Sequence, residues 1–323
     1  MINKLSSLNQ SLFLHWVFKI RNLKSTLETL KKELGLKVLR HEEFNTSCEA
    51  SCNGNFDNAW SKTMVGLGDE LSFFALELVY NYSKNEDYKQ HKGMLNLEFF
   101  SKNDDKNYKE FKMENYSMAK FNNFYCKEYL KILSNEMTEN DFNHDFKFVT
   151  LEVNDLDKSL EYFTTILNMN VYTRDKIIKV ENYQNVLNQD FLLNNQRNFS
   201  ILGYAKDKTL LKLVQCENGT SVIQSEDSGR MAFACNVDVF KIKEKIDNFN
   251  EKILHQPVVL KTSGKADVKV IILLEKNEYE ICFVEREGFR ELSTLNEGVD
   301  FIDWELRQSL DKTIENMRSI NNR

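Results

Sequence analysis

The feature that most constrains the fold is a long internal repeat. Residues 15–40 (HWVFKIRNLKSTLETLKKELGLKVLR) recur without a gap as residues 148–173 (FVTLEVNDLDKSLEYFTTILNMNVYT). The apolar positions coincide, so that Leu23 corresponds to Leu156 and the later leucines follow in register. Because a long-period repeat indicates duplicated supersecondary units, it predicts a scaffold built from copies of one module.

Each copy of the repeat predicts a strand followed by a helix. In the first copy, Trp16 and Phe18 alternate with less apolar positions, as in a half-buried strand. The leucines of residues 23–34 are then spaced as the apolar stripe of a helix. Gly35 follows, where a helix C-terminus favours a residue that tolerates positive φ, and Asn168 takes that place in the second copy.

The remainder of each copy predicts more strands. We expect them at residues 74–80 and around 125–130 in the first copy, and at residues 210–214 and 279–284 in the second. A weaker second half begins at Gly93 in one copy and at Gly229 in the other. The chain is therefore predicted to contain four β-α-β-β-β modules.

These modules predict an α+β fold with two tandem domains, residues 1–140 and residues 141–323, of two modules each. Helices are expected to cover one face of each sheet, and two paired modules curl so that the open face forms a cup. The second domain contains an insertion rich in Asn and Gln at about residues 175–199, predicted to be a loop over the cup rim. Residues 303–318 predict an amphipathic terminal helix.

Composition excludes several classes of function. A hydrophobic content of 41% with 28% charged residues is typical of a soluble globular protein, and a net charge of −6 does not favour nucleic-acid binding. No stretch approaches 18 apolar residues, so we expect no membrane partner. The start of the chain does not resemble a secretory signal, which predicts a cytoplasmic protein. A plastid or mitochondrial location is the alternative if a leader is missing.

The six cysteines have no paired C-x-x-C spacing of the kind that binds zinc. Without an export signal, free thiols are expected. Cys48 and Cys52 are spaced C-x-x-x-C and are predicted to be reduced structural thiols, with a redox pair as the alternative.

Several segments resemble a known family. The opening HWVFKI…LGLKVLR and the segment ALELVYNY are similar to the vicinal-oxygen-chelate superfamily, and within it to the glyoxalase I group. Residues 38–68 (VLRHEEFNTSCEASCNGNFDNAWSKTMVGLG), 253–273 and 280–293 resemble the glyoxalase-domain-containing protein 4 family. The resemblance runs from about Leu14 to Ser293 and implies a fold of four such modules.

The resemblance also implies a chemistry. In glyoxalase I, a divalent metal such as Ni²⁺, Zn²⁺ or Co²⁺ stabilises an enediolate, and a ligand carboxylate doubles as the base. The four positions that correspond to the metal ligands of glyoxalase I, which we call the ligand columns, are His15, Glu77, Met94 and Tyr129 in this chain. The first two suit a metal, whereas Met94 and Tyr129 do not complete a site for a hard cation. The same columns in the second copy contain Phe148, Lys212, Arg230 and Cys282, which excludes a metal site within that copy.

The pairing of the modules determines which residues surround His15 and Glu77. Tandem pairing adds Met94 and Tyr129. Swapped pairing, which some double-length glyoxalases have, would bring module one against module four. That arrangement adds Arg230 and Cys282, of which the thiolate is a good zinc ligand. Neither arrangement supplies the second carboxylate.

The sequence therefore predicts a glyoxalase I-like protein with an incomplete metal site at His15 and Glu77, which swapped pairing would extend to Cys282. We expect any divalent metal to be weakly bound or absent, little or no lactoylglutathione lyase activity, and binding of a small molecule or a changed activity. The alternative is a metal-dependent lyase or isomerase acting on α-oxoaldehyde–thiol adducts, as in methylglyoxal detoxification. An extradiol dioxygenase would need a second histidine in these columns.

The predicted ligand is a small molecule, and the chain is expected to be a monomer or a homodimer. The positions expected to line the pocket are Met94, Tyr129, Phe148, Lys212, Arg230 and Cys282. Lys212 and Arg230 are either solvated charges or anion-binding groups, because an arginine suits a carboxylate or a phosphate.

Overall fold

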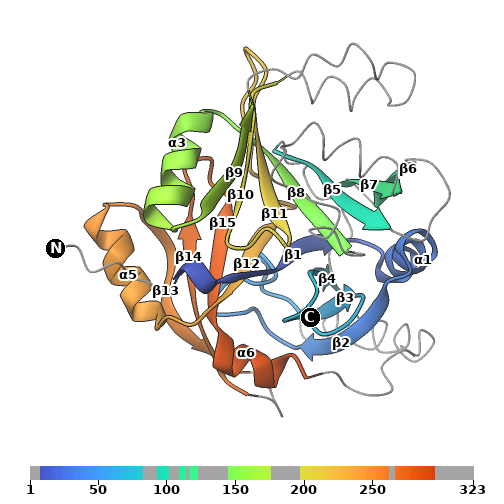
Figure 1. Ribbon diagram of the computed structural model, residues 1–323. Helices are drawn as coiled ribbons and strands as arrows, with labels where there is room; N and C mark the ends of the chain where they lie inside the picture. Colours follow the sequence, from blue (N-terminus) through green and yellow to red (C-terminus); the bar gives the residue numbers. More distant parts are fainter. Residues whose placement is uncertain are drawn as a thin grey trace.

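The computed structural model describes residues 8–82, 93–101, 109–113, 116–122, 145–175, 197–261 and 266–294. Over these residues the chain forms two mixed β-sheets, one of eight strands and one of seven (Figure 1). Tyr129, the predicted helix at 303–318 and nearly all of the insertion at 175–199 lie outside the described residues. None of the described helices is long and apolar enough to cross a membrane.

Module one has the predicted order of elements. A short 3₁₀ turn, Leu8–Gln10, is followed by β1 (Leu12–Ile20), α1 (Leu23–Leu34), β2 (Lys37–Phe44), β3 (Trp60–Gly66) and β4 (Ala75–Asn81). Asn22 caps the N-terminus of α1, and its side chain accepts a hydrogen bond from the Ser25 backbone amide. The helix ends at Gly35, whose φ of 69° confirms the left-handed position predicted there.

Module three repeats this order. Its elements are β8 (Asp145–Val153), α3 (Leu156–Glu161), a π-helical turn (Tyr162–Ile166), β9 (Asn170–Asp175), β10 (Phe199–Gly203) and β11 (Leu210–Gln215). Asp155 caps α3 by accepting from the Lys158 amide. Asn168 has a φ of 60°, as predicted for the residue in the place of Gly35.

Module four contains β12 (Arg230–Cys235), α5 (Val239–Asn248), β13 (Lys252–Leu260), β14 (Val268–Leu274), β15 (Glu280–Glu285) and the short α6 (Arg286–Leu292). In module two the described elements are β5 (Met94–Ser101), β6 (Lys109–Met113) and β7 (Tyr116–Asn122). The strand parallel to β5 is β7. Residues 125–130, where a strand was predicted, lie outside the described residues.

The order of the strands decides between the two pairings. The eight-stranded sheet has the order β13-β14-β15-β12-β1-β4-β3-β2, and the other has β6-β7-β5-β8-β11-β10-β9. Module one joins module four through antiparallel β1 and β12, with Trp16 opposite Met231. Modules two and three join through β5 and β8, with Leu97 opposite Val149. The pairing is therefore swapped, and in both sheets hydrogen bonding crosses the boundary at residue 140 that separates the two copies of the repeat.

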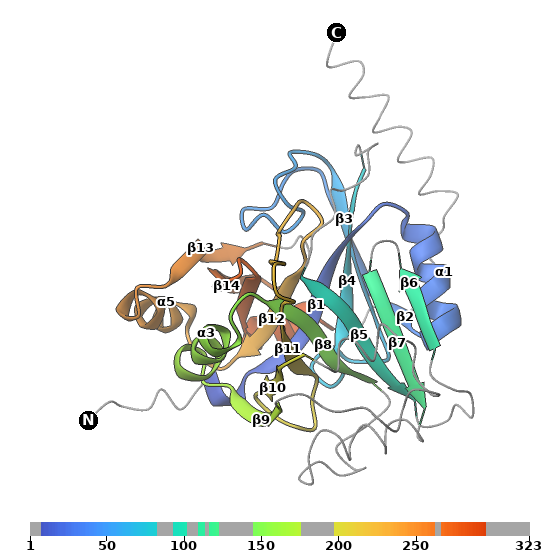
Figure 2. The same cartoon turned by 90° about the horizontal axis from the view of Figure 1, so that it is seen from above.

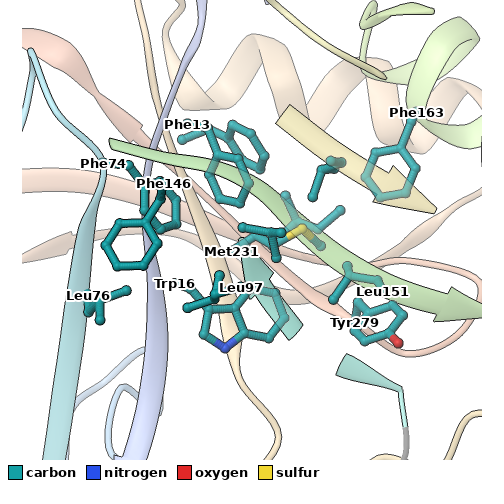
Figure 3. Packing of buried hydrophobic residues seen from close by; sticks show 14 of the residues in the cluster. Phe13, Trp16, Phe74, Leu76, Leu97, Phe146, Leu151, Phe163, Met231 and Tyr279 are labelled. Carbon is teal, nitrogen blue, oxygen red and sulfur yellow. The ribbon is translucent and has the colours of Figure 1, made fainter. Parts of the chain in front are cut away.

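The main core takes side chains from both sheets. Phe13 and Trp16 of β1 pack in one cluster with Phe146 and Leu151 of β8 and Met231 of β12, and all five are buried (Figure 3). Helices α3 and α5 lie on one side of the molecule and α1 on the opposite side (Figures 1 and 2). One face of each sheet is thus used for the core, and the other is left for the cup.

The two glycines that open modules two and four are required by this packing. A Cβ added at Gly229 would lie 2.2 Å from Trp16 Nε1, and one added at Gly93 would lie 2.3 Å from Tyr279 Oη. Both distances are far below van der Waals contact. An aromatic ring therefore crosses the first residue of each of these modules, where only glycine leaves enough room.

Candidate functional site

A bulge in β1 positions His15. The register between β1 and β12 shifts between Phe13, opposite Phe233, and His15, opposite Ala232. The extra residue, Leu14, belongs to a separate cluster away from the main core. Phe13 and Trp16 therefore both point into the core, while His15 points to the opposite face of the sheet, which we call the cup face.

His15 and Glu77 are in direct contact on the cup face. Glu77 of β4 lies opposite Val17 of β1, and its neighbours Leu76 and Leu78 point into the main core. His15 Nε2 lies 3.2 Å from Glu77 Oε2, and the two residues are only 6% and 7% exposed. Among the described residues, the buried His15 Nδ1 has no hydrogen-bond partner.

The environment keeps Glu77 ionised. Burial alone would raise its pKa, but the hydrogen bond and charge of His15, with the charges of Lys62 and Arg40, lower the pKa of Glu77 to about 2. At neutral pH this side chain is therefore a carboxylate that accepts a hydrogen bond from His15.

A buried charge network lies next to Glu77. Arg40 of β2 and Met64 of β3 share a row across the sheet with Glu77. Arg40 donates to both oxygens of Glu70, at 2.6 Å from Nε and 3.3 Å from Nη2, and to Glu42 at 2.5 Å from Nη1. Burial lowers the pKa of Arg40, but the charges of Glu70 and Glu42 outweigh it and raise this pKa. The cup face thus carries ion pairs that neutralise one another.

Arg230 and Cys282 lie on the same face. Arg230 Nε and Nη2 donate to Glu280 Oε2 at 2.7 Å and 2.6 Å, and Nη2 also donates to the Ser51 carbonyl at 3.3 Å. Cys282 lies opposite Ala232 on the neighbouring strand. Burial raises the pKa of the Cys282 thiol to about 12, with Glu77 adding to the shift and Arg230 opposing it. The thiol is therefore protonated at neutral pH.

Four groups near Arg230 were not predicted from the sequence. Lys19 of β1 donates to the Ser228 carbonyl at 3.2 Å. Burial lowers the pKa of Lys19, and it also lowers the pKa of His255 on β13. The charges of Arg230 and Glu280 act on both groups. Alternation along the strands would have placed Lys19 and Glu280 on the cup face had the pairing been known, whereas no sequence signal singles out His255 or the Ser51 carbonyl.

The loop between β2 and β3 lies over this face; we call residues 45–59 the cover loop. Ala50 is fully buried and clusters with Ala234, Val284 and Phe289. Cys48 and Cys52 form a disulfide, with their Cα atoms 5.4 Å apart. The prediction of two reduced thiols was therefore wrong for this structure. A turn closed by the Ser51 amide and the Cys48 carbonyl, at 2.9 Å, brings the two cysteines together.

The other predicted positions belong to the second sheet. Met94 lies at the start of β5, opposite Leu151, and Phe148 is buried on β8. Lys212 of β11 is 2% exposed and lies 3.3 Å from the buried Glu98 carboxylate, which also accepts from Thr150 at 3.0 Å. Swapped pairing therefore separates Met94 from His15, and Lys212 is a member of a buried ion pair and not a solvated charge.

The side chains around His15 do not fit a divalent cation. Among the described residues, no group of three or more His, Cys, Asp or Glu side chains comes together. The four columns supply one imidazole, one carboxylate, one guanidinium and one protonated thiol. A guanidinium repels a cation, and a thiol must lose its proton to bind one.

Comparison with known proteins identifies the family. Residues 177–292 match the protein-family model that describes the C-terminal domain of glyoxalase domain-containing protein 4-like proteins. The chain is 35% identical to "Glyoxalase domain-containing protein 4" of Rattus norvegicus over 293 residues, 88% of each chain. The chain belongs to the glyoxalase-domain-containing protein 4 family. The predicted family is thereby confirmed.

Two further comparisons concern a second relative and the fold. It is 33% identical to "Glyoxalase 1" of Caenorhabditis briggsae over 312 residues, 93% of this chain and 96% of that one. The crystal structure of glyoxalase I from Zea mays is similar with a TM-score of 0.64 and 19% identity, over 90% of this chain and 97% of that one. At this identity the likeness shows the fold, and it confirms the predicted α+β architecture of the vicinal-oxygen-chelate type.

Proposed function

We propose that this protein is a glyoxalase I-like binding protein whose cup face holds a small anionic molecule, with little or no lactoylglutathione lyase activity. One observation carries the proposal. His15 and Glu77 contact each other, while the third and fourth ligand columns hold Arg230 and Cys282.

The missing base argues against lyase turnover. A general base must accept a proton near neutral pH, and a thiol with a pKa of about 12 is already protonated there. Removing a general base typically costs about 10²–10⁴-fold in rate. The positive charge of Arg230 in a ligand column also opposes the metal that would stabilise an enediolate.

Arg230 supports an anionic ligand. Its planar fork suits a carboxylate or a phosphate, and its present partner is the Glu280 carboxylate. The Glu280 side chain is 28% exposed, so it can rotate toward solvent and leave the guanidinium to a ligand. The amine of Lys19, which interacts electrostatically with Arg230 and Glu280, adds a second basic group at the same end of the cup.

A metal-dependent lyase or isomerase acting on α-oxoaldehyde–thiol adducts is the second candidate. The names of the relatives favour it, since proteins called "Glyoxalase 1" in Caenorhabditis briggsae and Caenorhabditis elegans are 33% and 30% identical to this chain.

The remaining expectations form part of the proposal. The ligand is a small molecule, with no nucleic-acid or membrane partner, and the chain acts as a monomer or a homodimer. The net charge of −6 supports the first exclusion. A cytoplasmic location is proposed, with a plastid or a mitochondrion as the alternative.

Two measurements test the proposal. With glutathione and methylglyoxal, and with Ni²⁺, Zn²⁺ or Co²⁺ added, we expect no turnover above the uncatalysed rate, and less than one tightly held metal ion per chain. Isothermal titration against small carboxylates and phosphates should show binding that Arg230→Gln weakens at least tenfold. Arg290→Gln, on the exposed face of α6, is the matched control. Metal-dependent turnover that Glu77→Gln abolishes would establish the second candidate instead.

A further inference from the structure

The cover loop contacts the cup face through residues 50–54, in which Asn53 is fully buried and exchanges hydrogen bonds with Asn81 of β4 at 3.0 Å and 3.1 Å. The fully buried Ala50 packs in the cluster that includes Val284 and Phe289, and the Ser51 carbonyl accepts a hydrogen bond from Arg230. Further along the loop, Gly54 lies against Lys19, because a Cβ added at Gly54 would lie 3.4 Å from Lys19 Cε. The loop thus covers the two cations of the cup, Arg230 and Lys19.

The disulfide encloses this contact. Cys48 and Cys52 stand on either side of Ala50 and Ser51, the residues that contact the cup. Both cysteines are partly exposed, so a small thiol or disulfide in solution reaches them. Both pack against the same aliphatic cluster as the partly buried Cys282. A bond at the surface of the loop is therefore connected to the packing inside the cup.

We propose that Cys48 and Cys52 form a reversible disulfide that controls access to the cup face: the oxidised loop covers it and the reduced loop opens. The inference concerns the accessibility of the face and does not require that the ligand be anionic, or that any ligand be known.

The chemistry is ordinary thiol–disulfide exchange with a small-molecule disulfide as oxidant. The thiolate of one cysteine attacks the small disulfide, which forms a mixed disulfide and releases one small thiol. The second cysteine then attacks the mixed disulfide and releases the other small thiol. The protein loses two electrons and two protons, which the two released thiols carry. A small dithiol reverses the change and is itself oxidised to a disulfide.

The backbone conformation explains why the bond matters. Ser51 has a φ of 49°, a left-handed conformation that residues other than glycine adopt at a cost. The covalent ring of residues 48–52 restricts the alternatives to this turn. Without the ring, the hydrogen bond from Arg230, the burial of Ala50 and the two hydrogen bonds between Asn53 and Asn81 remain to hold the segment down. Closing a ring of this length restricts the open loop enough that reduction should raise the frequency of opening at least tenfold.

Cys282 supplies a reporter inside the cup. The full-length protein is oxidised with oxidised glutathione or reduced with dithiothreitol, which is then removed. Peptide mass spectrometry first verifies that Cys48 and Cys52 gain and lose the bond. The rate at which N-ethylmaleimide modifies Cys282 is then measured in each state. We expect it to be at least about tenfold faster after reduction.

Two controls make the result specific. Cys235 is fully buried on β12 with its side chain in the main core, and its labelling rate should not change with the redox state. The Cys48→Ser/Cys52→Ser double variant should label at Cys282 at the fast rate with or without oxidised glutathione. If this variant does not fold, the reduced wild-type protein still provides the comparison.

Equal Cys282 labelling in the two states, or failure of oxidised glutathione to re-form the bond, would overturn the proposal. Neither outcome bears on anion binding at Arg230. Failure of the proposed function, in turn, leaves the labelling result intact, so the two are separable.

Discussion

Replacing Glu77 by glutamine tests whether its contact with His15 is an energetic feature of the fold. The pKa of Glu77 is lowered from 4.5 to about 2, which corresponds to about 3 kcal/mol in favour of the ionised form in the folded protein relative to the unfolded chain. Glutamine resembles the protonated carboxyl in shape and charge. Because Glu77 is 7% exposed, solvent screens this energy little, and we expect Glu77→Gln to lower the free energy of unfolding by about 3 kcal/mol at pH 7.

The pH dependence of this loss has a definite sign. A carboxyl with a depressed pKa in the folded protein contributes stability above the pKa of the unfolded chain, here 4.5. The contribution is lost as the pH falls through the folded-state pKa of about 2. The difference between wild type and Glu77→Gln should therefore be constant above pH 4.5 and shrink steadily between pH 4.5 and pH 2.

Urea unfolding, followed by tryptophan fluorescence at several pH values, measures the difference directly. Glu28→Gln, an exposed carboxylate on α1, is the matched control and should change the stability by no more than about 0.5 kcal/mol. A loss that does not depend on pH, or a variant more stable than the wild type, would refute the reasoning. A more stable variant would mean that burying the Glu77 charge costs more free energy than its contact with His15 contributes.

Three further predictions use other parts of the fold. Gly229→Ala should lower the unfolding free energy by more than about 2 kcal/mol in the same urea assay, because its Cβ would overlap Trp16 Nε1. Arg40→Met should cost about 3–5 kcal/mol in that assay, since Glu70 would stay buried without a counter-charge while Glu42 keeps Lys62, and a neutral effect would contradict the buried network. The rate of Cys282 alkylation should keep rising beyond pH 10 without a plateau, because its pKa is about 12; a rate that levels off just above pH 9.0 would show an unperturbed thiol.

Much of the fold is predictable from local pattern. The helix ends at Gly35 and Asn168 follow from the need for a left-handed residue, and the strand faces follow from alternation. Pairing between modules is different. The first strand of a module presents the same apolar face to the core in both pairings. Trp16 would therefore be buried whether module one pairs with module two or with module four. The periodic pattern of one strand specifies which face is buried but does not specify which other module supplies the neighbouring strand.

The site shows the same limit more sharply. The likeness to glyoxalases selects His15 and Glu77, and the structure brings them within 3.2 Å of each other. Arg230 and Cys282 beside them come from β12 and β15, more than 150 residues away, and the Ser51 carbonyl comes from the cover loop. A carbonyl group carries no sequence signal, and the bulge at Leu14, which turns His15 toward the cup, is a local departure from strict alternation.

The two sheets suggest why corresponding positions both carry a charged side chain although the charges differ in sign. Glu77 and Lys212 occupy corresponding positions, on the strand parallel to the first strand of modules one and three, and the sheets bury both to 7% or less. A buried charge requires a counter-charge or a hydrogen bond whatever its sign. His15 meets this requirement for Glu77, and Glu98 meets it for Lys212, from a different strand and with the signs reversed. The fold therefore dictates that a charge at this column be partnered, while the identity of the partner, and with it any catalysis, is decided separately in each sheet.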